Sequence, residues 1–292
     1  MTYFAGRSEY QVYRQSAPGA ARRLIGRHAV AWPRYMHSFG ITGHYAVLAE
    51  FPLVVNPLRL LLGGRPFIEN YRWEPERGTR AIVFDLRDGG VRGVYETAAC
   101  FAFHHVNAWE DSEHSGDLVL DMCAYDDASV IGALYLDRLR AGQRVPLARP
   151  TRYRIDLRSG RVAVERLTDE ALELPRIAYD RCNGRGYRFA YGVGAVDGRD
   201  DDFANKLVKL DTTTGETLTW SQADCYPGEP VFVPDPHGAA EDDGVVLSVV
   251  LDSTAQSSLL LALDARTFGV LARVQAPHII PFGFHGLFTT HT

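Results

Sequence analysis

Three histidines of this chain lie in aromatic and apolar segments, where histidine is uncommon. His37 lies in Tyr-Met-His-Ser-Phe, His104 in Phe-Ala-Phe-His-His-Val-Asn, and His285 in Gly-Phe-His-Gly-Leu-Phe. They are too far apart in the sequence to form a local metal-binding motif. A fold that gathers their imidazoles at one apolar centre would make a site for a redox metal beside a pocket for an apolar substrate. The alternative is three separate core histidines, each satisfied by its own hydrogen bond.

Length and composition indicate a chain that can bury a sizeable core. It has 292 residues, of which 46% are hydrophobic, enough for one large domain or two small ones. A net charge of −5 predicts no general attraction to nucleic acid. The cysteines (Cys100, Cys123, Cys182 and Cys225) form no CxxC pair, so we expect reduced thiols in a cytoplasmic protein. Neither an apolar signal region nor a membrane-spanning apolar run is evident, so we expect no secretion and no spanning helix.

The elements that would have to position the histidines are strands. Short alternating apolar segments recur between Gly, Asp, Asn and Pro, which is typical of an all-β protein. A weak repeat consists of a strand ending in Asp, a short turn that usually contains Gly, and a second strand. Its four copies lie at 82–95, 153–164, 207–220 and 260–272. The Asp can bond the turn backbone, and Gly can adopt the positive φ that such turns need.

Two architectures contain such hairpins, the β-sandwich and the β-propeller. The repeated turn chemistry and its spacing favour propeller blades. A propeller also gives the histidines a meeting place, because the inner strands of successive blades converge on a central axis. One histidine from each of several inner strands can therefore reach a single ion there.

One segment, residues 51–64, is unusually apolar for a connection between strands. One hypothesis is a short helix that covers one face of the domain. The other is an apolar entrance, or a patch resting on a membrane, through which a lipid-like substrate passes. Under the second hypothesis, residues 51–68 would make peripheral contact with the membrane. The sequence favours neither.

Four segments resemble the carotenoid cleavage oxygenases, a family that includes plant and bacterial carotenoid dioxygenases. Residues 103–111, Phe-His-His-Val-Asn-Ala-Trp-Glu-Asp, resemble the family's FHxxNAxE segment. Residues 35–42 and 280–286 resemble its second and last histidine segments, and residues 229–234 with 241–248 resemble a late blade. The segments follow the family's order across essentially all 292 residues. The resemblance thus identifies residues 1–292 as one carotenoid oxygenase domain, the C-terminal part of the propeller.

The resemblance implies a seven-bladed β-propeller with an Fe(2+) ion on its axis, held by four histidines. It makes His37, His104 and His285 metal ligands. His104 rather than His105 takes this role in the doublet, because alternation along a strand points His105 the other way.

The family also implies carboxylates that accept a hydrogen bond from the second nitrogen of a ligand histidine and so fix its tautomer and direction. Glu229 fits this pattern, and Glu173 fits it less closely. Each would otherwise be a solvated acid at a loop or strand end. Glu110 suits either role.

The implied reaction is the oxidative cleavage of a carotenoid or apocarotenoid. An all-histidine site leaves iron its full positive charge, and open positions admit O2, which adds across one C=C bond to give two carbonyl products. The protein would position that bond and exclude water with an aromatic tunnel. Phe103, Trp109 and Phe284 are candidates to line the tunnel, or else belong to the ordinary core.

The sequence departs from the family pattern at its front. The family's first histidine and first blades lie upstream of the segment matching His37, so only three of four ligands are present. We expect such a chain to bind iron weakly and to have little activity. His28 and His44 lie in polar contexts and are disfavoured as a fourth ligand. The alternative function is a non-catalytic propeller remnant that binds a lipid-like ligand or a protein partner.

Overall fold

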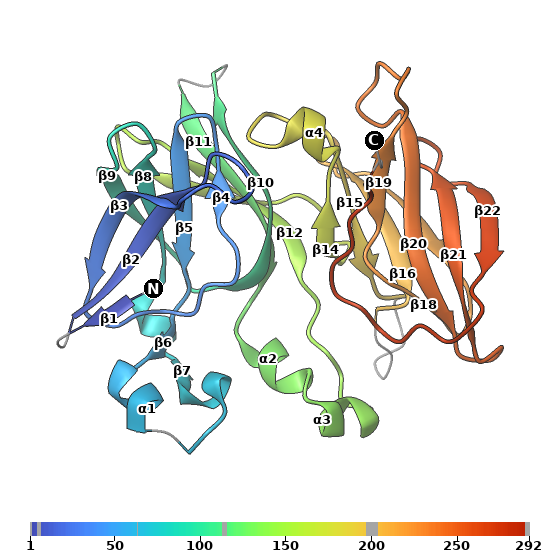
Figure 1. Ribbon diagram of the computed structural model, residues 1–292, viewed down its shortest axis with the longest axis horizontal. Helices are drawn as coiled ribbons and strands as arrows, with labels where there is room; N and C mark the ends of the chain where they lie inside the picture. The colour runs from blue at the N-terminus through green and yellow to red at the C-terminus, as the bar shows by residue number, and fades with distance from the viewer. Residues whose placement is uncertain (1, 5–6, 63, 113–115, 197–203, 290–292) are drawn as a thin grey trace.

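The computed structural model of the protein describes residues 2–4, 7–62, 64–112, 116–196 and 204–289. These residues form antiparallel sheets joined by loops and a few short helices (Figure 1). Five of the sheets contain three to five strands, and in four of them the order of strands across the sheet is their order along the chain. The prediction of an all-β protein is confirmed.

The sheets comprise the following strands. The first contains β1 (Thr2–Phe4), β2 (Arg7–Arg14) and β3 (Arg23–Val30), and the second contains β4 (Gly40–Ile41), β5 (Tyr45–Glu50), β8 (Thr79–Asp85) and β9 (Val91–Thr97). The third contains β10 (Phe101–Asp111), β11 (Asp117–Tyr125), β12 (Arg149–Ile155) and β13 (Val162–Arg166). The fourth contains β14 (Glu173–Arg176), β15 (Phe189–Gly194), β16 (Lys206–Asp211) and β17 (Thr217–Ser221). The fifth contains β18 (Cys225–Pro227), β19 (Val231–Pro234), β20 (Gly244–Asp252), β21 (Ser257–Asp264) and β22 (Val270–Gln275).

The remaining elements are small. A two-stranded sheet contains β6 (Leu53–Val55) and β7 (Tyr71–Trp73), which lie between β5 and β8 in the sequence. The α-helices are α1 (Pro57–Leu62), α2 (Ser129–Ala133), α3 (Leu136–Arg140) and α4 (Tyr179–Cys182), and the 3-10 helices are η1 (Phe67–Asn70) and η2 (Pro75–Arg77). Within the described part of the chain, no helix has the length and apolar content needed to cross a bilayer.

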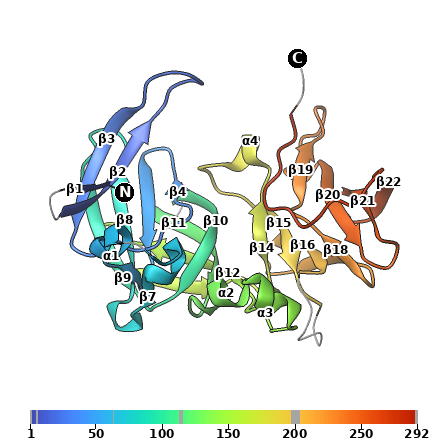
Figure 2. The ribbon, with the colours of Figure 1, turned by 60° about the horizontal axis from the view of Figure 1, so that its bottom comes forward.

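Successive sheets are arranged as propeller blades. The first strands of the second, third and fourth sheets, β4, β10 and β14, contact one another in that order. The last strands of these sheets lie outside and carry mostly exposed or half-exposed residues, as does β22 in the fifth. Figures 1 and 2 show the sheets following one another from the N-terminal to the C-terminal side, with β10 and β14 between the two groups. The predicted β-propeller fold is confirmed, and the described residues contain five sheets that correspond to blades.

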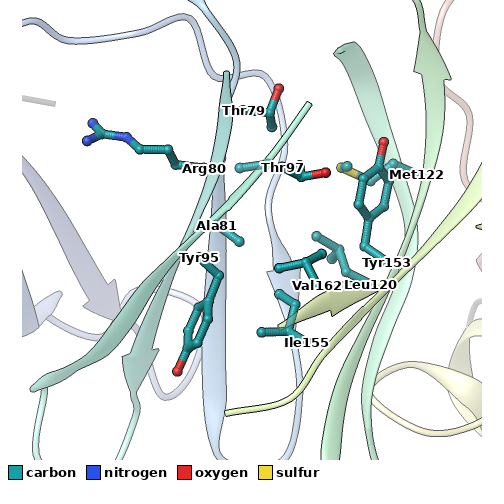
Figure 3. Close-up of a pocket in the computed structure, with 11 residues that line it drawn as sticks. Thr79, Arg80, Ala81, Tyr95, Thr97, Leu120, Met122, Tyr153, Ile155 and Val162 are labelled. Atoms are coloured by element: carbon teal, nitrogen blue, oxygen red, sulfur yellow. The ribbon is translucent and has the colours of Figure 1, made fainter. Parts of the chain in front are cut away.

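Apolar side chains fill the space between neighbouring blades. The largest buried cluster joins the second, third and fourth sheets through residues such as Val83, Leu120 and Val208. A gap of only about 10 Å³ lies between the second and third sheets. Figure 3 shows the side chains that line it, which include Ala81, Leu120 and Ile155. Because this gap holds no more than a water molecule, these two blades pack as a continuous core.

The four predicted hairpins are present as β8–β9, β12–β13, β16–β17 and β21–β22. In each, the N–H of the predicted Asp donates to the carbonyl five residues on, and its own carbonyl accepts a bond from the residue four positions on. The Asp side chain accepts one or two further turn N–H groups, as Asp156 does from Arg158 and Ser159. The predicted side-chain-to-backbone bonding is therefore present in all four turns.

One turn differs in the residue that takes positive φ. Gly89, Gly160 and Gly215 fill this position with φ of 77°, 76° and 76°. In the fourth turn Phe268 fills it with φ of 61°, although Gly269 follows directly. The Phe268 ring is buried and stacks on Tyr191, with ring centroids 6.3 Å apart. Core packing thus offsets a backbone conformation that disfavours side chains.

The apolar segment 51–68 divides into two parts. Residues 51–55 are buried and include β6, whereas Leu58 of α1 and Phe67 of η1 are 52% and 58% exposed. The segment thus contains a short helix, α1, as the first of the two hypotheses requires. Exposed Leu136 of α3 lies at the same end of the molecule (Figure 1), where the Tyr135 hydroxyl lies 3.4 Å from Glu69 Oε1.

Candidate metal centre

The structure brings the three predicted histidines together. His37, His104 and His285 each present one ring nitrogen, and these nitrogens lie within 4.8 Å of one another. The ring centroids of His37 and His104 are 5.2 Å apart, and those of His104 and His285 are 5.1 Å apart. His37 precedes β4, His104 lies on β10, and His285 lies in the segment after β22. Sequence-distant histidines thus meet beside the inner strands, as the propeller predicts.

His104 owes its direction to an irregularity in β10. The register between β10 and β11 pairs Ala102 with Ala124 and then His105 with Met122, which leaves one extra residue in β10 before His105. A second extra residue follows His105, because Asn107 pairs with Asp121. Such bulges redirect side chains and are frequent near functional sites. The imidazole Nδ1 of His104 lies 2.6 Å from Glu173 Oε2 on β14. A carboxylate only accepts, so Nδ1 carries the proton and Nε2 keeps its lone pair.

His285 is held by a network centred on Glu229. Glu229 Oε1 lies 2.8 Å from His285 Nδ1, and its Oε2 accepts a 2.8 Å bond from the Gly286 N–H. Arg176 of β14 donates to the same Oε2 at 2.8 Å and to the Gly286 carbonyl. Glu229 is buried, so these partners replace its lost hydration. These bonds connect the C-terminal segment to the fourth sheet through Arg176 and to the fifth sheet through Glu229.

His37 has a different partner, the Tyr35 hydroxyl, which lies 3.1 Å from its Nδ1. The two residues are two apart in a segment without regular secondary structure, and their rings stack with centroids 6.3 Å apart. Burial is the main cause that lowers the pKa of His37, and the neighbouring His104 lowers it further. The pKa shift favours the neutral imidazole, the form that binds metals.

The set fits a metal ion. All three Nδ1 atoms have polar partners, which leaves the Nε2 atoms for an ion. The Nε2 of His104 is buried with no hydrogen-bond partner among the described residues, a costly state for a polar atom unless a ligand satisfies it. Imidazoles backed by carboxylates are the usual donors for transition metals.

The other candidate histidines lie elsewhere. His105 directs its Nδ1 to Ser38 Oγ at 2.7 Å, and burial lowers its pKa to about 3. His44 pairs with Glu110 through a 2.8 Å contact outside the cluster, and His28 packs edge-on against Phe84. Among the described residues the cluster therefore contains three histidines. The partner of Glu110 lies in a neighbouring loop, which sequence spacing alone does not reveal.

The three candidate tunnel residues lie in different surroundings. Phe103 packs against His37, with centroids 5.5 Å apart. Phe284 is 79% exposed and, with His285, lines a cavity of about 320 Å³ between the C-terminal segment and the fifth sheet. Trp109 is buried under the Arg152 guanidinium, which lies 5.0 Å from its ring centroid, and belongs to the core between blades.

Sequence reasoning did not assign a role to Asn107, which follows the histidine doublet. Its buried amide donates to the Cys182 and Arg185 carbonyls at 2.9 Å and accepts from the Gly184 N–H. The side chain thus joins β10 to the loop after α4. Tyr35 and Arg176 were also missed. The two-residue spacing from His37 was a signal for Tyr35, whereas no local signal marks Arg176.

Comparison with known proteins identifies the family of the chain and agrees with its fold. Residues 1–290 match the family model described as retinal pigment epithelial membrane protein. The chain is 37% identical to the carotenoid isomerooxygenase of Galleria mellonella, covering 92% of this chain and 56% of that protein. It is 32% identical to the mitochondrial carotenoid-cleaving dioxygenase of Homo sapiens, covering 88% of this chain and 51% of that protein.

A solved structure shows the same architecture. Cobalt-substituted apocarotenoid oxygenase of Synechocystis superposes with a TM-score of 0.85 at 25% identity, covering 99% of this chain and 60% of that one. The chain belongs to the family of retinal pigment epithelial membrane protein and the carotenoid oxygenases, and is homologous to carotenoid dioxygenases. It spans about half the length of the curated relatives it matches.

Proposed function

We propose that the protein cleaves a C=C bond of a carotenoid or apocarotenoid with O2, using Fe(2+) held by His37, His104 and His285. The observation that carries this proposal is the convergence of the three imidazoles within 4.8 Å. The relatives named as carotenoid-cleaving enzymes support the substrate class. One O2 and one C=C bond balance two carbonyl groups, so no further reductant is required.

The three imidazole donors are suited to a transition metal, and the need to activate O2 favours iron among these metals. Imidazole alone suits zinc, copper, iron and nickel. When bound, Fe(2+) would supply the redox chemistry that activates O2, which zinc does not provide. The solved structure of the Synechocystis relative is cobalt-substituted, which supports a transition-metal centre here.

The chain's own residues have three roles in this proposal. Glu173 and Glu229 would hold the ligand imidazoles in one tautomer and direction. Phe103 would contribute an apolar wall beside His37 that excludes water. Phe284, at the cavity next to His285, would contact the polyene, whereas the packing of Trp109 supports a core role instead.

The proposal extends to location. We expect a cytoplasmic protein that contacts a membrane peripherally through segment 51–68. The exposed Leu58 and Phe67, with Leu136 beside them, support this contact, because carotenoids partition into bilayers. Sedimentation with neutral phosphatidylcholine vesicles checks it: Leu58→Ser with Phe67→Ser should reduce the bound fraction. An unchanged fraction would contradict it.

The central experiment measures iron stoichiometry and O2-dependent cleavage of an apocarotenoid aldehyde. His104→Ala should abolish both, whereas His44→Ala, which removes a carboxylate-paired histidine outside the cluster, should leave both unchanged. The assay is run with excess Fe(2+), so that an ion bound weakly is also detected. Loss of iron in the His44 variant, or an apocarotenoid bound without oxygen-dependent cleavage, would overturn the proposal. The latter result would support the non-catalytic alternative.

A further inference from the structure

Ser38 lies between the two segments that contain His37 and His104. Its Oγ donates a 2.8 Å bond to the Phe103 carbonyl and accepts a 3.0 Å bond from the His105 N–H. It also lies 2.7 Å from His105 Nδ1. Three bonds from one half-buried hydroxyl therefore reach the two residues that flank His104.

The bonds occur where the β10–β11 ladder is irregular. The register gives no β11 partner for Phe103 or His104, because the first extra residue of β10 lies there. Backbone groups at a bulge lose ladder bonds and need other partners. Ser38 supplies them from outside the sheet, so its hydroxyl stabilises the bulge that directs His104 toward the cluster.

The direction of the Ser38 O–H bond also determines which ring nitrogen of His105 carries a proton. Ser38 has one proton, and the Phe103 carbonyl can only accept it. Ser38 Oγ therefore accepts from His105, whose Nδ1 must bear its proton. This bond fixes His105 facing away from the cluster, while the next residue back, His104, faces into it. The two histidines of the doublet are thus held in opposite directions by different partners.

We propose that Ser38, supported by His105, is a positioning residue that sets the separation of His37 and His104 for metal binding. Ser38 is bonded to His37 through one peptide and to the backbone on either side of His104 through hydrogen bonds. Displacing it would move one ligand relative to the other. We call the hydrogen bonds that join Ser38 to Phe103 and His105 the clamp. Its effect on metal binding rests on the proposed function, whereas the clamp itself does not.

The clamp is tested first in metal-free protein. In Ser38→Ala, amide hydrogen exchange of His105 should speed up about tenfold or more, because the N–H loses its acceptor. Ser38→Thr keeps the hydroxyl and should restore slow exchange. Thr79→Val is the matched control, since the Thr79 hydroxyl makes the same pair of bonds to Cys100 away from the histidines. Unchanged exchange in Ser38→Ala would overturn the clamp.

The consequence is tested with Co2+ as the probe. Ser38→Ala should weaken Co2+ binding by about 10-fold to 100-fold and alter the visible spectrum of the bound ion. Ser38→Thr and Thr79→Val should retain the wild-type affinity and spectrum. Equal affinity in Ser38→Ala and wild type would overturn the positioning role. If wild-type protein binds no Co2+, the proposed function fails, and the exchange measurement still decides the clamp.

Discussion

At the scale of single residues, three imidazole–carboxylate pairs have similar geometry, but only two adjoin the candidate metal centre. His104 and His285 belong to the cluster and are paired with Glu173 and Glu229, whereas the His44–Glu110 pair lies outside it. Similar contacts thus occur in different contexts. Because His44 is not a candidate ligand, a change in the carboxylate of this third pair serves as a control for changes in the carboxylates that contact ligand histidines.

Glu229→Gln is predicted to weaken Co2+ binding by about 10-fold to 100-fold, because the neutral amide is a poorer acceptor for His285 Nδ1–H. Isothermal titration measures the affinity. Glu110→Gln should leave it within error of wild type. Equal losses in both variants would indicate a general charge effect and contradict a specific role for Glu229.

At the scale of secondary-structure elements, the local sequence predicts the hairpins but not the bulge in β10. Each repeat hairpin was predicted from an Asp and its turn residues, because these bonds form within a few residues of the chain. The bulge in β10 was not predicted, since nothing local marks the extra residue and its backbone partners come from Ser38. The bulge also means that simple alternation does not by itself explain the opposite directions of His104 and His105.

The turn aspartates predict a dependence of stability on pH. The Ser159 hydroxyl, followed by turn N–H groups, lowers the pKa of Asp156 to about 2. Because its folded-state pKa lies below the unfolded value of about 3.9, its contribution is present above pH 4 and is lost as pH falls toward 2. Asp156→Asn should therefore lose less unfolding free energy between pH 5 and 3 than wild type in urea titrations. An identical loss would contradict this prediction.

Phe268 predicts an unusual order of substitutions. Removing its buried ring should destabilise the protein by about 3–5 kcal/mol in Phe268→Ala. Phe268→Gly loses the same ring but relieves the positive φ, so it should be more stable than the Ala variant by about 1 kcal/mol. At most positions Gly is the more destabilising. Urea denaturation of both variants measures the difference, and the ordinary order would contradict a strained Phe268.

At the scale of the whole molecule, the candidate ligands come from three distant parts of the chain. The family resemblance predicted the three histidines and their carboxylates, although composition and spacing alone left each as a possible core residue. Neither revealed Arg176 or the Asn107 link, because their partners lie far away in the sequence. The core position of Trp109 likewise depends on Arg152, which lies on another strand.

Metal binding should therefore stabilise the folded protein as a whole. At free Co2+ a hundredfold above the dissociation constant, mass action contributes about 2.7 kcal/mol, so the thermal midpoint should rise. Differential scanning calorimetry measures this shift. It should vanish in His104→Ala and persist in His44→Ala. A rise of equal size in the His104 variant would place the ion elsewhere.

The C-terminal segment after β22 has a kinetic consequence. Residues 276–289 have no regular secondary structure, and the bonds of Glu229 and Arg176 hold the part around His285 in place. A segment secured mainly by side chains can detach while the blades remain folded. The lifetime of a bound ion would then be set by how often this segment detaches. Mild denaturant should accordingly hasten release of the ion well below the concentration that unfolds the sheets.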